Sequence, residues 1–140
     1  MASFVIATPY DRISVLQIPI YGTHIIVSEK FYQQIKHRFI LRKVDRIIVK
    51  GKYTSMDIYE LLAENRDEIS FDLEKYENRF AQGFKAYEEV RFEEALFFFN
   101  ECLAIYPEDS VAKVFIERVQ FFLHYPPPAD WKGIWRLSEK

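Results

Sequence analysis

The chain contains 140 residues, of which 49% are hydrophobic and 24 are aromatic (13 Phe, 9 Tyr and 2 Trp), and this composition excludes an intrinsically disordered protein. The formal net charge of −2 provides no bulk electrostatic attraction to nucleic acid or to an acidic membrane surface, so we expect neither as a partner. Because Cys102 is the only cysteine, a disulfide within the chain and a cysteine-based zinc site are excluded, and a reducing cytoplasm is the expected compartment.

No membrane segment is predicted in the sequence. The longest stretch without Asp, Glu, Lys or Arg runs from Ile13 to Ser28, and a proline and a glycine interrupt it. It is shorter than the roughly 20 apolar residues that a spanning helix needs. Asp11 and Arg12 also interrupt the apolar start of the chain, which therefore does not resemble a targeting peptide.

The first part of the chain predicts two short strands and a helix. A weak strand is expected from Ile13 to Ile20, at the edge of a sheet because a proline lies within it. A short β-branched strand should follow from His24 to Val27. Ser28 is typical of a helix N-cap and Glu29 of a first helical turn, so a helix is predicted from there to about Arg38.

A β-hairpin is predicted next. The β-branched run Ile47–Val49 is followed by Gly51, which marks a turn, and by a second apolar run from Met56 to Leu61. Lys50 and Lys52 flank the glycine, where backbone amides and ammonium groups can converge on an anion such as phosphate. The alternative is that both lysines belong to a solvated face of the hairpin.

Three helices are predicted in the second half. Apolar residues at steps of three and four predict helices over residues 72–90 and 92–105, and Pro107 ends the second one. Asp109 or Ser110 can cap a third helix, which a run of three prolines stops. The polar segment between the hairpin and these helices marks the junction of the two halves.

The remaining ionisable residues predict no catalytic or metal site. His24, His37 and His124 have no metal-ligand spacing, and we expect surface or satisfied core histidines. Cys102 falls on the apolar side of its helix and is expected to be buried and inert. Four carboxylates around one helix turn are expected to be solvated: Glu88, Glu89, Glu93 and Glu94.

The helical half has the spacing of a tetratricopeptide repeat. Gly83, Ala95, Phe99 and Pro107 occupy the small, alanine, aromatic and proline positions of that pattern, whereas Val90 replaces the usual turn glycine. The small residues would let two antiparallel helices approach closely. Two interpretations remain open: a groove that binds a peptide or partner, and a helical pack that shields the first half.

Two stretches of the first half share a pattern of strands and motifs with one family. In YGTHIIVSEKFYQQI a strand leads to Ser-Glu at the start of a helix, and in RKVDRIIVKGKYTSMDIYELL an Arg-rich strand leads to VKGK and then to IYE. In order and spacing, the two stretches resemble the C-terminal part of a class III adenylate/guanylate cyclase catalytic domain. The ending PPPADWKGIWRLSEK resembles the close of helical tails that some bacterial cyclases carry, so the resemblance covers residues 20–140.

The resemblance implies an α+β fold in three parts. Residues 1–64 would form a C-terminal remnant of the cyclase domain, with residues 1–19 unmatched. This remnant is a partial ferredoxin-like unit of strands, one helix and a C-terminal β-hairpin. Residues 71–125 would form tetratricopeptide-like (TPR-like) helices, and residues 126–140 a Pro- and Trp-rich C-terminal strap.

The resemblance also implies a chemistry. In the family, the ribose 3′-hydroxyl of ATP or GTP attacks the α-phosphate and pyrophosphate leaves, while two aspartates hold two Mg or Mn ions and an Asn–Arg pair orients the ribose. A lysine of the VKGK segment holds the triphosphate; Lys50 matches it residue by residue, and Lys52 is a further candidate. Arg12 lies near the place of the family arginine, one position out of register, and Thr8 stands where the asparagine would be.

Essential parts of that machinery have no counterpart in this sequence. The metal-binding aspartates belong to the first half of the family domain, and Asp11 does not stand in their sequence context. We therefore expect no catalytic residue, no metal or other cofactor held by this chain, and no cyclic nucleotide from the chain alone. Such a chain would be the end of a cyclase behind a foreign start, from a truncated or frameshifted gene.

Three functional hypotheses follow. In the first, the chain is a cyclase remnant that pairs with a second copy or with another cyclase chain, because family active sites form between two catalytic domains. In the second, the TPR-like helices form a module that binds a protein or peptide. In the third, the chain is a regulatory nucleotide-binding subunit that uses Lys50.

Overall fold

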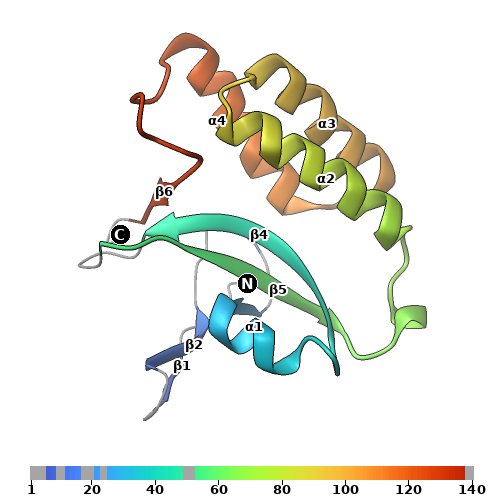
Figure 1. Cartoon of the computed structure of the whole chain (residues 1–140). Helices are drawn as coiled ribbons and strands as arrows, with labels where there is room; N and C mark the ends of the chain where they lie inside the picture. Colours follow the sequence, from blue (N-terminus) through green and yellow to red (C-terminus); the bar gives the residue numbers. More distant parts are fainter. Residues whose placement is uncertain (1–5, 9–11, 17–20, 23–24, 49–52, 138–140) are drawn as a thin grey trace. The chain divides into compact units, whose positions relative to one another are not determined.

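The computed structural model divides the chain into two compact units. It describes residues 6–8, 12–16, 21–22, 25–48 and 53–137. Residues 1–69 and 134–140 form one unit, here called the sheet unit, and residues 70–133 form the other, here called the helical unit. The mixture of a sheet and separate helices confirms the predicted α+β class (Figure 1).

In the described part of the chain, the sheet unit contains six strands. They are β1 (Ile6–Thr8), β2 (Arg12–Leu16), β3 (Ile26–Ser28), β4 (Ile40–Ile48), β5 (Met56–Ala63) and β6 (Trp135–Arg136). Their order across the sheet is β1-β2-β3-β5-β4-β6 (Figure 1). Neighbouring strands are antiparallel, except that β6 runs parallel to β4.

The first predicted strand is placed differently from the prediction. β2 ends at Leu16, before Pro19, and it pairs with β1 on one side and with β3 on the other. The expectation of an edge position is therefore wrong, because β2 has a paired strand on each side; Pro19 itself lies outside the described residues. The second predicted strand, His24–Val27, is observed as β3 at Ile26–Ser28, and His24 lies outside the described residues.

The first helix begins where the sequence predicts. Helix α1 spans Glu29–Ile35, and the Ser28 hydroxyl accepts a hydrogen bond from the Phe31 amide at 3.2 Å, which confirms the N-cap. The helix ends three residues before Arg38. Tyr32 of α1 stacks on Tyr59 of β5 with ring centroids 3.8 Å apart, so α1 packs against the sheet through this pair.

Strands β4 and β5 form the predicted hairpin, and β4 contains both the Arg-rich strand that the family resemblance implies and the start of the β-branched run that follows it. Strand β4 starts at Ile40, seven residues before the β-branched run. Its register against β5 shifts between Lys43 and Asp45, which leaves Val44 without a cross-strand partner and forms a β-bulge. The turn predicted at Gly51 lies outside the described residues.

The helical unit contains the three predicted helices, and a short 3-10 helix, η2 (Arg66–Glu68), precedes them in the sheet unit. Helices α2, α3 and α4 span Leu73–Glu88, Phe92–Ile105 and Ser110–His124. The carboxylate of Asp109 caps α4 by accepting hydrogen bonds from the amides of Val111 and Ala112. Asp109 is therefore the cap, and Ser110 is the first residue of the helix.

Aromatic side chains form the core of the helical unit. Its fully buried rings come from all three helices: Tyr76, Tyr87, Phe99 and Phe115. Gly83 of α2 faces this core, and a Cβ atom there would lie 2.9 Å from Cε1 of Phe99. Helices α2 and α3 therefore approach closely at Gly83. Whether the unit is related to tetratricopeptide repeats stays a prediction.

Candidate functional site

The residues predicted to bind phosphate lie at the margins of the described structure. Lys50 and Lys52 lie outside the described residues, and Arg12 is described only as the first residue of β2. Strand β4 ends at Ile48, two residues before Lys50. The placement of these three side chains thus lies outside what the structure describes, and their role stays a prediction.

A buried ion pair joins the two strands of the hairpin. Arg42 of β4 and Glu60 of β5 are cross-strand partners. The guanidinium nitrogens Nε and Nη2 of Arg42 lie 2.8 and 2.7 Å from Oε1 of Glu60, and both side chains are almost fully buried. Removal of either charge would leave the other buried without its partner, so this pair ties β4 to β5 in one register.

Asp45 forms a second buried polar contact, next to the bulge in β4. Its Oδ2 accepts a hydrogen bond from the hydroxyl of Tyr21, and its Oδ1 accepts one from the Arg46 amide at 2.7 Å. Asp45 and Tyr21 are both fully buried. No local sequence motif singles out Asp45, because its partner Tyr21 lies 24 residues away along the chain.

The other carboxylate of the hairpin is half-buried. Asp57 lies 3.5 Å from the ammonium of Lys43 and 3.1 Å from Nε of Arg46. Burial, followed by the negative charge of Asp57, raises the pKa of Tyr59 to about 12. Tyr59 therefore stays neutral at physiological pH and stacks on Tyr32 as an uncharged ring.

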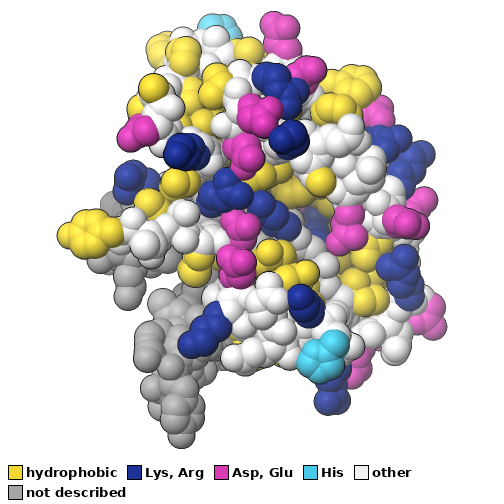
Figure 2. All heavy atoms as spheres, in the orientation of Figure 1, with side chains coloured by type: hydrophobic (Ala, Val, Ile, Leu, Met, Phe, Trp, Pro, Cys, Tyr) yellow, Lys and Arg dark blue, Asp and Glu magenta, His cyan; other side chains and the backbone are white. Residues whose placement is uncertain are grey.

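The basic stretch of residues 30–52 is thus partly neutralised across the hairpin. It holds eight Lys and Arg residues against one acid, but the three at positions 42, 43 and 46 pair with carboxylates of β5. On the face drawn in Figure 2, basic and acidic side chains lie interspersed. A charge count along the sequence overstates the basic patch, because the neighbouring strand supplies acids.

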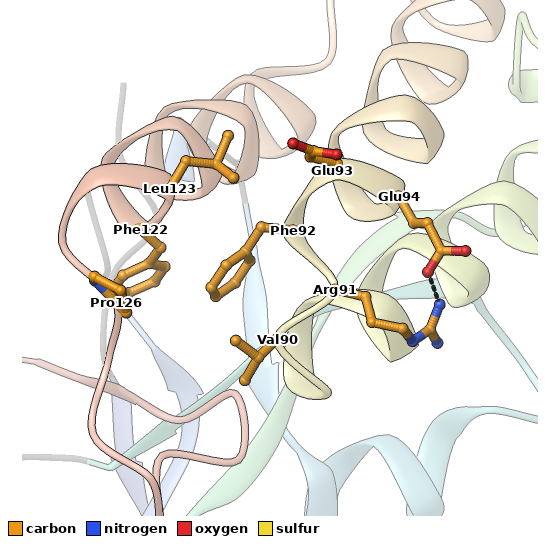
Figure 3. A pocket seen from close by; sticks show the side chains of 8 residues that line it. All are labelled: Val90, Arg91, Phe92, Glu93, Glu94, Phe122, Leu123 and Pro126. Carbon is orange, nitrogen blue, oxygen red and sulfur yellow. Dashed lines mark hydrogen bonds and ion pairs between the residues drawn. The ribbon is translucent and has the colours of Figure 1, made fainter.

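A cleft in the helical unit is a second candidate site. It has a volume of about 440 Å³ and lies between the α2–α3 turn and the end of α4 (Figure 3). Its lining combines apolar and charged side chains: Val90, Arg91, Phe92, Glu93, Glu94, Phe122, Leu123 and Pro126. The sequence does not reveal this cleft, because its walls come from two segments about thirty residues apart. Only the packing of α3 on α4 brings these segments together.

The backbone at the edge of this cleft is strained. The Arg91 amide donates to the Ala86 carbonyl at 2.8 Å and the Val90 amide to the Tyr87 carbonyl at 3.1 Å, a pair that defines a Schellman motif. This motif requires a left-handed residue, and Val90 has φ = 66°. Glycine is usual there, because a β-branched side chain clashes with its own backbone.

By residue type, the histidines and the cysteine are also possible ligands or nucleophiles. His37 and His124 are exposed, His24 lies outside the described residues, and the Cys102 thiol is fully buried. Among the described residues, no group of three or more His, Cys, Asp and Glu side chains could hold a metal ion. The helices that the structure describes are all too short or too polar to cross a bilayer.

Part of the chain is similar to a known adenylate cyclase. Eighty residues of the chain, 57% of its length, are 32% identical to "Adenylate cyclase, terminal-differentiation specific" of Dictyostelium discoideum. The matched segment spans only 4% of that protein. No protein-family model matches the chain, and no solved structure matches it. More than half of this chain is therefore similar to part of an adenylate cyclase.

Proposed function

We propose that the sheet unit is a cyclase-derived element that contributes a triphosphate-binding lysine, Lys50, to a nucleotide site. The similarity of 80 residues to an adenylate cyclase carries this proposal. The β4–β5 hairpin supports it, because β4 leads directly to the VKGK segment in which Lys50 lies. As a compact point charge, the ammonium of Lys50 would hold a triphosphate without taking part in bond making.

The three carboxylates of strands β4 and β5 do not fit the family's two-metal site. Asp45 is buried against Tyr21, and Asp57 and Glu60 are engaged by basic side chains of β4. We therefore place no metal ion on these three carboxylates; that the chain itself holds no cofactor stays a prediction. The ribose-orienting pair is also incomplete, so the chain alone would make no cyclic nucleotide.

The proposed nucleotide site is incomplete in a single chain. A complete site would need a second chain, either another copy or a different cyclase, in a cytoplasm that contains ATP or GTP. We also propose that the helical tail is TPR-like and of bacterial origin. A specific observation, the cleft at the α2–α3 turn, favours a second function for the helical unit as a protein-binding module.

An activity measurement tests the proposed inactivity. The purified full chain is incubated with ATP or GTP and Mn²⁺, and the cyclic nucleotide is quantified against a heat-inactivated sample. We expect the two samples to be indistinguishable, because the chain does not supply the two metal-binding aspartates. Sustained, protein-dependent production of cyclic AMP or cyclic GMP would refute the proposal.

A further inference from the structure

The cleft of the helical unit has a rigid apolar floor. Phe92 of α3 and Phe122 of α4 point toward one another, with ring centroids 5.3 Å apart (Figure 3). The indole of Trp131 packs on both, at 5.8 Å from Phe92 and 5.0 Å from Phe122. All three side chains are buried. Because these rings hold one another in place, the cleft is formed before any partner binds.

Exposed apolar side chains rise from this floor. Val90 is 50% exposed and Leu123 is 42% exposed, and Pro126 is also exposed. Single exposed apolar residues are common on proteins, but these three converge on one cleft. Its volume of about 440 Å³ lies within the range of ligand pockets. The cleft can therefore cover a large apolar side chain of a partner.

The rim of the cleft is acidic. Arg91, its one basic residue, is engaged by Glu89 at 2.7 Å and by Glu94. Glu93 is exposed and has no ion-pair or hydrogen-bond partner among the described residues. The helical unit as a whole carries 12 acidic and 7 basic residues, which gives it a formal net charge of −5. Charge complementarity thus favours a basic partner.

We propose that this cleft binds a partner protein through an apolar side chain flanked by lysine or arginine. The apolar side chain covers Val90 and Leu123 above the floor formed by Phe92 and Phe122, and a flanking cation pairs with Glu93. The site goes beyond the proposed nucleotide role, because every residue of the cleft belongs to the helical unit.

A peptide titration tests the proposal. The ¹⁵N-labelled full chain is titrated with two short, acetylated and amidated peptides that share a central Leu-Phe pair, flanked by lysines in one and by glutamates in the other. We expect the lysine peptide alone to give saturable shifts, centred on the amides of residues 90–94 and 122–123. Added NaCl should weaken its binding, because salt screens the contact with the rim.

Two variants and a matched control assign the binding to the cleft. Leu123→Asp should weaken the lysine peptide more than tenfold by removing apolar contact, and Glu93→Lys about two- to fivefold, as for an exposed ion pair. Phe97→Asp replaces an apolar residue of α3 that is 58% exposed and outside the cleft, and should leave binding unchanged. Circular dichroism melts show that each variant is folded; should Leu123→Asp unfold the chain, the surface change Glu93→Lys still decides.

Several results would overturn the proposal. In the titration, these results are equal binding of the lysine and glutamate peptides, the absence of a saturable shift with the lysine peptide, or shifts centred outside the cleft. In the variants, the result is that Glu93→Lys binds the lysine peptide as tightly as the wild type does. Sedimentation distinguishes a competing occupant: a wild-type dimer that Leu123→Asp converts to a folded monomer would show that a second copy of this chain fills the cleft.

Discussion

Among single residues, Val90 carries the clearest backbone strain. It is a β-branched residue in the left-handed position of a Schellman motif, with φ = 66°. Val90→Gly should raise the free energy of unfolding by about 1 kcal/mol, because the relief of steric strain exceeds the extra entropy that glycine gives the unfolded chain. Urea denaturation of the wild type and the variant measures this change.

Val90→Ala is the matched control for this prediction. Alanine removes the β-branch but keeps a Cβ atom in the left-handed region, so its gain should be smaller than that of glycine. A Val90→Gly variant that is no more stable than the wild type would show that the α2–α3 turn does not strain the folded chain.

Tyr59 predicts a dependence of stability on alkaline pH. Burial and Asp57 raise the pKa of Tyr59 to about 12 in the folded chain, whereas the pKa of tyrosine in an unfolded chain is about 10. The folded state therefore holds a proton that the unfolded state loses. This contribution is fully present below pH 10 and is lost as the pH rises toward 12.

The variant Tyr59→Phe isolates this effect. Between pH 10 and 12 its stability should fall less steeply than that of the wild type, as measured by urea denaturation at each pH. Tyr53→Phe, at a tyrosine that is 96% exposed, is the control and should follow the wild type. Identical slopes for Tyr59→Phe and the wild type would contradict the assignment.

Between elements, the contact of α2 with α3 depends on Gly83. In an ordinary helix, Gly→Ala stabilises the chain, because alanine has the higher helix propensity. Here the added Cβ would lie 2.9 Å from the buried ring of Phe99, so Gly83→Ala should lower the free energy of unfolding by about 1–3 kcal/mol. Gln82→Ala, at the exposed neighbouring position of α2, should be nearly neutral; a stabilising Gly83→Ala would contradict the close approach of the helices.

Within the hairpin, the Arg42–Glu60 pair determines how β4 and β5 hold together. Glu60→Ala leaves the buried guanidinium without this partner and should lower the free energy of unfolding by about 3–5 kcal/mol. Replacing both residues by Met and Leu should recover most of the loss. Lys43→Ala, which removes a half-exposed contact to Asp57, should cost less than about 1 kcal/mol. Equal losses for Glu60→Ala and Lys43→Ala would argue against a special role of the buried pair.

The elements also show which parts of the fold the sequence could predict. Helices α2 to α4 follow from apolar periodicity, and the polar caps at Ser28 and Asp109 locate two helix starts. The first half of β4 followed only from the family resemblance and not from the apolar pattern, because its charged residues resemble a solvated loop until the carboxylates of β5 are placed beside them. The cleft could not be predicted, because it depends on tertiary packing rather than on a local motif.

For the whole molecule, the two proposed sites belong to different units. The sheet unit carries the cyclase-like motif that contains Lys50, and the helical unit carries the acidic, apolar cleft. The sequence alone pointed to the first through a local motif, whereas the second depends on the packing of α3 on α4. Because the two sites share no residue, loss of one function should leave the other measurable.

The central proposal, that Lys50 of a cyclase-derived sheet unit binds a triphosphate, is tested most directly by calorimetry. The full chain is titrated with ATP and with GTP in the presence of Mn²⁺, alongside Lys50→Ala and the control Lys113→Ala, which removes an exposed lysine of α4. We expect weak binding by the wild type and by Lys113→Ala, and a loss of about tenfold or more in Lys50→Ala, as for a charged phosphate contact. Absence of binding by the wild type, or equal affinities of wild type and Lys50→Ala, would contradict the proposal.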